Sequence, residues 1–391
     1  MSEAATIATR AAARLAEREA AGLRRGLREV EHADGVRLRV AGRELRSFAS
    51  NDYLGLAQHP EVIAAMKDAA DRWGVGSTAA HLLGGHRGPH AQLERTVADW
   101  LGYESALLFS TGYLANLGVI AGLLERGDTC VQDKLNHASL IDAARLAGCV
   151  LRRYPHGDVD AAARQLDAAA DTPRMLATDG VFSMDGDLAP LRELAALARA
   201  RAALLFVDDA HGFGVLGPDG QGSPEQLGLG ADDVPLRMVT LGKAVGCGGA
   251  LVLGSRALIE ALLQFAQPFV YSTAMPPAVA AAALAAIVIL RREPQRRAHL
   301  QDLIARFRAG VAQLGGVLMD SSTPIQPLLL GDAANASARS LSLWQQGLYV
   351  PAIRPPTVPA GSARLRVTLS AAHTTADVDR LLDALDRARA A

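Results

Sequence analysis

The sequence is poor in cysteine, and the three cysteines that it contains are far apart. Cys130, Cys149 and Cys247 include no Cys-x-x-Cys pair. An odd number of isolated cysteines offers neither a disulfide framework nor the ligand spacing of a zinc site. The pattern is typical of a protein in a reducing compartment, and we expect a cytoplasmic location and no bound metal.

The chain also lacks an excess of charge of either sign. It carries 40 Lys and Arg against 41 Asp and Glu, which leaves a net charge of −1 over 391 residues. Because the signs are well mixed, no basic stripe is available for the phosphates of a nucleic acid. We therefore expect a small-molecule enzyme and no nucleic-acid partner.

Long apolar runs are absent as well, although half of the residues are hydrophobic. The longest, Ala278 to Leu290, is mostly alanine and shorter than the ~20 residues that a membrane-spanning helix needs. The N-terminal stretch at 2–29 has no compact apolar region and contains several glutamates, so it predicts an amphipathic helix and neither a signal nor a transit peptide. A mean hydropathy of +0.13 then indicates a large core without a membrane.

What the chain does contain, from about Asn51 to Leu290, is an alternation of short apolar runs with longer amphipathic segments. The clearest runs are 105–109, 175–178, 203–207 and 238–241, with helix-like stretches such as 191–201 between them. Short β-rich runs that alternate with helices predict a mostly parallel, doubly wound sheet covered on both faces.

The pattern changes after the arginine-rich segment 291–297. A predicted helix and three strand-like runs follow, and a last helix begins near Thr374 or Thr375, either of which is a good N-cap. These later elements are expected at 297–314, 326–330, 349–353 and 365–369. The predicted fold class is α/β, with an N-terminal helical arm (1–50), a large domain (51–290) and a small C-terminal α/β domain (291–391).

Polar residues follow three of the apolar runs directly. One run ends in Asp208-Asp209-Ala210-His211, another in Gly242-Lys243, and a third in Ser110-Thr111-Gly112-Tyr113, which opens a helix. Ligands of open α/β sheets bind beyond the carboxyl ends of the strands, so we expect these residues to meet.

Such a group has the parts that pyridoxal phosphate requires. A lysine amine can form the imine, and a carboxylate can keep the pyridine nitrogen protonated so that the ring accepts electrons. Backbone N–H groups at a helix start can hold the phosphate. Each part alone has an ordinary alternative, since a lysine after a strand is usually a solvated surface residue and Asp-Asp-Ala-His could be a capped turn or half of a metal site.

Three further patterns are weaker. His81, His86 and His90 could suggest a metal cluster, but neither an HExxH pattern nor a carboxylate spacing accompanies them. Gly242-Lys243 resembles the end of a P-loop, yet Ala244 replaces Ser or Thr and Arg237 replaces the first glycine. The segment 74–79 imitates a dinucleotide fingerprint, but it follows a predicted helix and not a strand.

Taken in order, these motifs resemble the α-oxoamine synthases, a family of fold-type-I pyridoxal-phosphate enzymes. The resemblance covers nearly the whole chain. It is carried by SNDYLGL (50–56), FSTGYLANLG (109–118), NHASLIDA (136–143), DGVFSMDGD (179–187), VDDAHGFGVLG (207–217), TLGKAVG (240–246) and YSTAMPP (271–277).

The resemblance implies roles in cofactor binding. Lys243 would be the Schiff-base lysine and the base that takes the substrate's α-proton, Asp208 would pair with the pyridinium nitrogen, and His211 would donate to the ring oxygen. His137 would stack on the ring. The other implied cofactor contacts are Gly112, Tyr113 and Thr240 around the phosphate, Ser183 near the ring oxygen, and Ser272 and Thr273 reaching the phosphate of a neighbouring subunit.

The resemblance also implies substrate contacts and a partner. Asn51 and Arg366 would hold the amino-acid carboxylate, since a guanidinium binds a carboxylate bidentately, and Arg24 and Thr357 would lie near the acyl substrate. Shared sites imply a homodimer. Two departures put fine geometry in doubt: Asp179 stands where the family has glutamate, and Ala79-Ala80 replace small Gly or Ser residues.

Within the family, the string AIRPPTVPAGSARLRVTL (352–369) favours a member that condenses L-alanine with a pimeloyl thioester in biotin biosynthesis, releasing CO2 and the thiol carrier. The carrier can be coenzyme A or acyl carrier protein. The alternatives are glycine C-acetyltransferase, also called 2-amino-3-ketobutyrate CoA ligase, and other α-oxoamine synthases. Two alternatives belong to other functional classes. One is a catalytically silent partner subunit of this fold, which would have lost the Schiff-base lysine, and the other is a P-loop nucleotide-binding protein.

Overall fold

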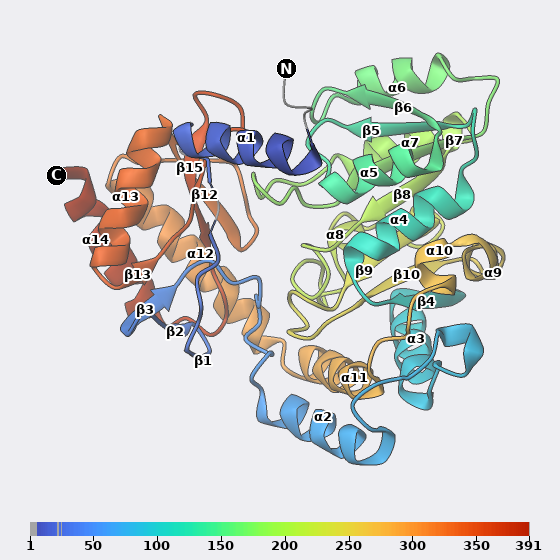
Figure 1. Ribbon diagram of the computed structural model, residues 1–391, viewed down its shortest axis with the longest axis horizontal. Helices are drawn as coiled ribbons and strands as arrows, with labels where there is room; N and C mark the ends of the chain where they lie inside the picture. Colours follow the sequence, from blue (N-terminus) through green and yellow to red (C-terminus); the bar gives the residue numbers. More distant parts are fainter. Residues whose placement is uncertain (1–5, 22, 25, 391) are drawn as a thin grey trace.

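The computed structural model describes residues 6–21, 23–24 and 26–390. A large domain built on a seven-stranded sheet lies beside a smaller α/β part, and the N-terminal arm runs along the latter (Figure 1). No helix among the described residues is long and apolar enough to cross a membrane.

The large sheet is mostly parallel, as predicted. Its order is β4-β10-β9-β8-β7-β5-β6. In this sheet β10 pairs antiparallel with β4 and β9, and the other described pairings are parallel. The strands are β4 (Ser105–Phe109), β5 (Thr129–Asp133), β6 (Val150–Tyr154), β7 (Arg174–Asp179), β8 (Leu204–Asp208), β9 (Leu236–Thr240) and β10 (Ala250–Gly254). The four predicted apolar runs correspond to β4, β7, β8 and β9.

Helices cover both faces of this sheet, which explains why its strands are continuous apolar runs. In β4, Leu107 and Phe109 pack with α4 and α9 on one face, while Ala106 and Leu108 pack with α2, α3 and α11 on the other. The helices of this domain are α2 (Pro60–Trp73), the 3-10 turn η1 (His81–Leu83), α3 (Gly88–Leu101), α4 (Gly112–Leu123), α5 (Ala138–Ala147), α6 (Val159–Asp167), α7 (Leu191–Ala200), α8 (Ser223–Gln226), α9 (Arg256–Phe265), α10 (Gln267–Val270) and α11 (Pro277–Arg292).

The C-terminal part has the predicted α/β pattern. Its sheet has the order β11-β12-β15-β14. The elements are α12 (Gln295–Gln313), β11 (Val317–Leu318), β12 (Ile325–Gly331), α13 (Ala333–Gln345), β13 (Leu348–Tyr349), β14 (Ala352–Ile353), β15 (Ala363–Thr368) and α14 (Thr375–Ala390). The chain turns between α11 and α12 close to the expected boundary at 290, and the division into domains stays a prediction.

The N-terminal arm is helical only in its first part. The predicted amphipathic helix is α1 (Ile7–Ala20), and residues 1–5, 22 and 25 of that stretch lie outside the described residues. Three short strands follow, β1 (His32–Asp34), β2 (Arg37–Val40) and β3 (Arg43–Ser47).

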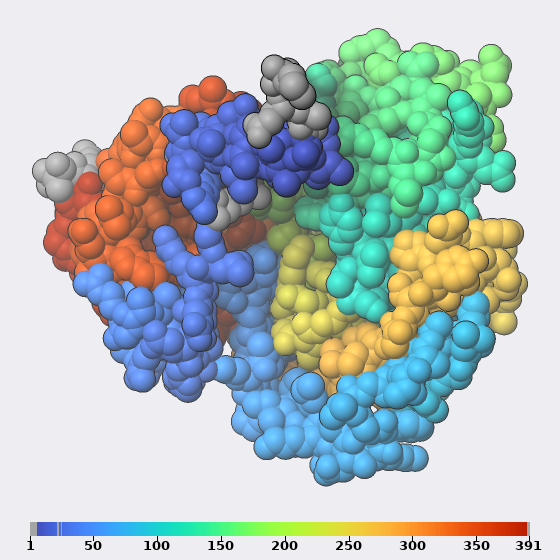
Figure 2. Space-filling model, viewed as in Figure 1, coloured from blue at the N-terminus to red at the C-terminus, as the bar shows by residue number. Residues whose placement is uncertain are grey.

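These strands join the arm to the C-terminal part. β3 pairs in parallel with β13, and Arg46 forms a 2.6 Å ion pair with Asp377 at the start of α14. In the space-filling view, α1 (dark blue) lies across the boundary between the small part (orange) and the green portion of the large domain (Figure 2). The strands were not predicted, because they are short and largely exposed and one is completed by a segment from the far end of the chain.

Candidate active site

A cavity of about 190 Å³ lies where the parallel strands end. Eight of the residues predicted to bind the cofactor line it, although they come from five separate stretches of the chain. These eight are Gly112, Tyr113, His137, Ser183, Asp208, His211, Thr240 and Lys243. The three segments that were expected to meet at the strand ends, 110–113, 208–211 and 242–243, all contribute residues to the cavity.

Lys243 follows β9 and enters this cavity with its amine. The Nζ atom is 2.9 Å from Nε2 of His211. Burial lowers the pKa of Lys243 to about 8, although the carboxylates of Asp208 and Asp179 oppose this shift. An amine with a pKa near neutrality is partly uncharged at physiological pH, and only an uncharged amine can attack a carbonyl or take a proton.

The structure separates the two adjacent acids at the end of β8. Asp208 lines the cavity, where its Oδ2 accepts a hydrogen bond from Asn116 Nδ2 (2.7 Å) and its Oδ1 accepts one from the N–H of Ala210 (3.0 Å). Asp209 turns away into the protein. Its carboxylate pairs with the fully buried Arg237 (2.5 Å) and accepts the hydroxyl of Ser223 (2.6 Å), so it is committed to the fold.

His137 lies at the rim of the cavity as the N-cap of α5. Its N–H donates to the Asp179 carboxylate (3.1 Å to Oδ2), and its Nδ1 is 2.8 Å from the Ser139 hydroxyl. Burial and the neighbouring Asp208 raise the pKa of Asp179. The hydrogen bond from the His137 N–H shows that aspartate at position 179, although shorter than the glutamate of the family, reaches the backbone of His137.

The N-terminus of α4 opens onto the cavity. Thr111 caps the helix by accepting the N–H of Leu114 (3.1 Å), so the N–H groups of Gly112 and Tyr113 remain in the first turn without an intrahelical partner. Thr240 stands opposite, with its hydroxyl 3.8 Å from the position of a Cβ on Gly112. Such a turn is suited to a phosphate group.

Asn51 and Arg366 do not line the cavity, but they lie next to it. The buried Tyr53 contacts His211 Nδ1 at 2.6 Å and Asn51 Oδ1 at 3.3 Å. Arg366, on β15, donates through Nε to the carbonyl of Ser183 (2.7 Å) and through Nη1 to the hydroxyl of Thr368 (2.9 Å). The first residues of the large domain and a strand of the C-terminal part thus converge on one site.

Arg24 and Thr357 line a second cavity, of about 270 Å³. Arg24 follows α1 and is paired with Glu19, while Thr357 lies in the turn between β14 and β15, where its N–H donates to the carbonyl of Arg354 (3.0 Å). This turn joins two segments that were expected to be strands, 349–353 and 365–369. The two residues, far apart in sequence, share this cavity.

Ser272 and Thr273 do not line either cavity within this chain. Their segment is hydrogen-bonded to Ala79 and Ala80, the second place where the sequence departs from the family pattern. Ala80 forms a β-bridge with Thr273, and the carbonyl of Ala79 accepts the N–H of Ala274 (3.0 Å). The adjacent Tyr271 is 81% exposed.

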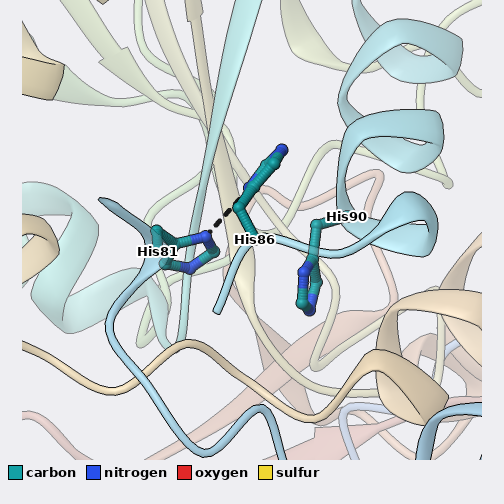
Figure 3. A group of neighbouring side chains, drawn as sticks. All are labelled: His81, His86 and His90. Atoms are coloured by element: carbon teal, nitrogen blue, oxygen red, sulfur yellow. Dashed lines mark hydrogen bonds between the residues drawn. The ribbon is translucent and has the colours of Figure 1, made fainter. Parts of the chain in front are cut away.

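The three histidines of the possible metal cluster do lie together (Figure 3). The Nδ1 atoms of His81 and His86 are 3.0 Å apart. His90 is bonded through both nitrogens, since Nδ1 accepts the N–H of Arg87 (2.8 Å) and Nε2 is 2.9 Å from the Met275 carbonyl. A ring used in this way has no free lone pair for a metal.

The nucleotide-loop alternatives lack their structural context. A P-loop joins a strand to a helix, but Gly242-Lys243 lies in a loop between β9 and the antiparallel β10. The glycine-rich segment 74–79 begins at the C-cap of α2, where no strand precedes it.

The comparisons with known proteins agree with this geometry. The profile described as aminotransferase class I and II matches residues 43–385. The 8-amino-7-oxononanoate synthase of Xanthomonas campestris pv. campestris (strain B100) is 58% identical over 363 residues, which cover 93% of this chain and 90% of the relative. The chain belongs to the 8-amino-7-oxononanoate synthase family.

Solved structures of related enzymes are also similar to this chain. The 8-amino-7-oxononanoate synthase of Francisella tularensis has a TM-score of 0.76 and 30% identity, covering 88% of this chain and 97% of the other. A serine palmitoyltransferase from S. paucimobilis with bound PLP-myriocin has a TM-score of 0.93 and 29% identity, covering 99% of both chains. The fold is that of the fold-type-I transferases, and the cofactor is pyridoxal phosphate.

The residues of the cavity fit this cofactor, because they supply a buried amine, a carboxylate, imidazoles and a helix N-terminus. Asn116 and Ser139 are among the cavity residues that were not predicted. Asn116 lies one helical turn after Gly112 and bonds both Asp208 and Ser139 (2.8 Å), and Ser139 lies two residues after His137. The i, i+4 spacing from Gly112 could have indicated that Asn116 faces the same side of α4.

Proposed function

We propose that this chain catalyses the decarboxylative condensation of L-alanine with a pimeloyl thioester, which yields 8-amino-7-oxononanoate, CO2 and the free thiol carrier in biotin biosynthesis. The single observation that carries the proposal is the convergence of Lys243, Asp208 and the α4 N-terminus on one cavity, in a chain 58% identical to an 8-amino-7-oxononanoate synthase.

The residues of the cavity divide the work. When bound, pyridoxal phosphate supplies an electron sink for the carbanion at the α-carbon of the amino acid. Lys243 would hold the cofactor covalently, and its amine would take the α-proton of the amino acid. Asp208, oriented by Asn116 and the N–H of Ala210, would keep the pyridine nitrogen protonated. Gly112, Tyr113 and Thr240 would bind the phosphate.

Different residues are assigned to the two substrates. Asn51 and Arg366 hold the alanine carboxylate, and Arg366 suits this role because its guanidinium is rigidly bonded to Ser183 and Thr368. The acyl chain lies toward Arg24 and Thr357, whose cavity is bordered by the 355–356 proline pair. His137, Ser183 and His211 line the same cavity, where His137 would cover the face of the cofactor ring and the other two would contact its oxygen.

A thiol-release assay tests the proposal directly. Alanine, glycine and serine are each combined with pimeloyl and acetyl thioesters, on coenzyme A and on acyl carrier protein. We expect the highest kcat/KM for alanine with a pimeloyl thioester. A preference for glycine with acetyl-CoA would instead assign the chain to glycine C-acetyltransferase.

Thr357 provides a test of the acyl subsite. Replacing it with tryptophan should fill the 270 Å³ cavity and lower kcat/KM for the pimeloyl thioester by about tenfold or more. Alanine binding, followed by the absorbance of the cofactor, should change little because its carboxylate is held elsewhere. Ala360→Trp, in the same exposed loop but outside the cavity, is the matched control. An equal loss of both steps in Thr357→Trp would contradict the assignment.

We also propose a homodimer with shared sites, in the cytoplasm. The exposed segment at 271–273, held in place by Ala79 and Ala80, is available to a neighbouring subunit. Ser272 and Thr273 would then complete the phosphate site of that neighbour.

Mixed dimers test this sharing. Lys243→Ala and the double variant Ser272→Ala with Thr273→Ala are each expected to be impaired. A hybrid of the two has one site with both intact halves, so it should regain about half of the wild-type activity. Isolated hybrids, separated by two affinity tags, that stay as impaired as their parents would show that each site is built within one chain.

A further inference from the structure

Tyr53 occupies a position from which it can control His211. The side chain is fully buried, and its Oη lies 2.6 Å from His211 Nδ1. The other ring nitrogen, Nε2, lies 2.9 Å from Lys243 Nζ. The imidazole therefore bridges the tyrosine hydroxyl and the lysine amine.

The distances indicate which group donates. An O–H donor makes shorter hydrogen bonds than an N–H donor, and 2.6 Å is typical of the former. The contact from the same hydroxyl to Asn51 Oδ1 is 3.3 Å, too long to compete for the proton. Burial also raises the pKa of Tyr53 to about 12, so the hydroxyl keeps its proton. Tyr53 thus donates to Nδ1.

This bond fixes the tautomer of the ring. Burial lowers the pKa of His211, which keeps the imidazole neutral, and a neutral imidazole that accepts at Nδ1 carries its proton on Nε2. That N–H faces Lys243 Nζ, and only an uncharged amine can accept it. Asp208 and Asp179 face the same amine and favour its charged form, whereas Arg366 opposes them.

We propose that Tyr53 is a positioning residue whose hydroxyl holds His211 in the Nε2-protonated tautomer, so that His211 presents an N–H to the uncharged amine of Lys243. The same tautomer is the one that His211 needs in order to donate to the oxygen of the cofactor ring. The inference rests on the proposed function only in taking Lys243 and His211 as cofactor residues.

The test uses the full-length chain stripped of cofactor, so it does not depend on turnover. Trace acetic anhydride labels uncharged lysine amines, and peptide mass spectrometry reads each site. The chain has only three lysines, and the exposed Lys67 and Lys134 serve as internal references. In Tyr53→Phe, His211 is free to accept from the ammonium form, so Lys243 should react about three- to tenfold more slowly near pH 7.5 relative to Lys67.

Tyr103→Phe is the matched control, because Tyr103 is also buried but its hydroxyl donates to the Val234 carbonyl (2.8 Å). It should leave Lys243 labelling unchanged. An unaltered rate in Tyr53→Phe, or a faster one, would overturn the proposal, since a faster rate means that Nε2 accepts a proton from the lysine in the wild type.

A second measurement needs no variant at position 53. In the wild-type chain labelled with 15N-histidine, the His211 signals, assigned by their loss in His211→Gln, should show Nδ1 unprotonated and Nε2 protonated. The reverse pattern refutes the role of Tyr53. Neither result depends on which substrates the enzyme uses, so a failure of the proposed reaction remains distinguishable.

Discussion

Replacing Lys243 with alanine is expected to lower turnover by about three to four orders of magnitude, because the amine that takes and returns the α-proton is lost. Its position at the end of β9, beside His211 and with a pKa lowered to about 8, suits both covalent binding and proton transfer. Thiol release at saturating alanine and pimeloyl thioester measures the loss.

A chemical readout accompanies this kinetic one. Borohydride treatment of the wild-type enzyme should fix the cofactor on the peptide that contains Lys243, and the variant should carry none. Lys134→Ala, at an exposed position outside the cavity, should keep both activity and label. Activity within tenfold of wild type in Lys243→Ala, or a label on Lys134, would contradict the assignment of Lys243 as the cofactor-binding lysine.

Replacement by asparagine should affect turnover at Asp208 and stability at Asp209, the two adjacent acids at the end of β8. Asp208→Asn removes the charge that faces the cofactor, so turnover should fall by about two to three orders of magnitude while the melting temperature changes little. Asp209→Asn breaks a buried ion pair and leaves Glu225 as the carboxylate partner of Arg237, which should cost about 3–5 kcal/mol of unfolding free energy.

Urea denaturation and thiol-release assays on both variants measure the two effects. Each variant is the control for the other, since both replace a carboxylate with an uncharged amide of the same shape at adjacent positions. If Asp209→Asn folded normally but lost turnover, and Asp208→Asn kept it, the acid that faces the ring would have been misassigned.

The local patterns of the sequence determined most of the large domain. Its strands are buried on both faces and therefore appear as uninterrupted apolar runs, and the polar residues that follow them must meet at one edge of a parallel sheet. This reasoning placed Asp208, Lys243 and Gly112 in one cavity without any knowledge of the tertiary structure. Helices α12 and α14 were also predicted from local sequence. Thr374, one of the two residues proposed as the N-cap of α14, accepts the N–H of Asp377 through its hydroxyl (3.2 Å).

Other features depend on contacts between distant segments, and only the tertiary structure decided them. The pairing of β3 with β13 and the shared cavity of Arg24 and Thr357 each join the two ends of the chain. The local pattern at the end of β8 does not distinguish Asp208 from Asp209, and only the family resemblance assigned Asp208. In the structure, Asn116 contacts Asp208 in the cavity, whereas Arg237 pairs with Asp209 inside the protein. The hydrogen bond from Tyr53 to His211 likewise exists only because a loop after β3 folds against the end of β8.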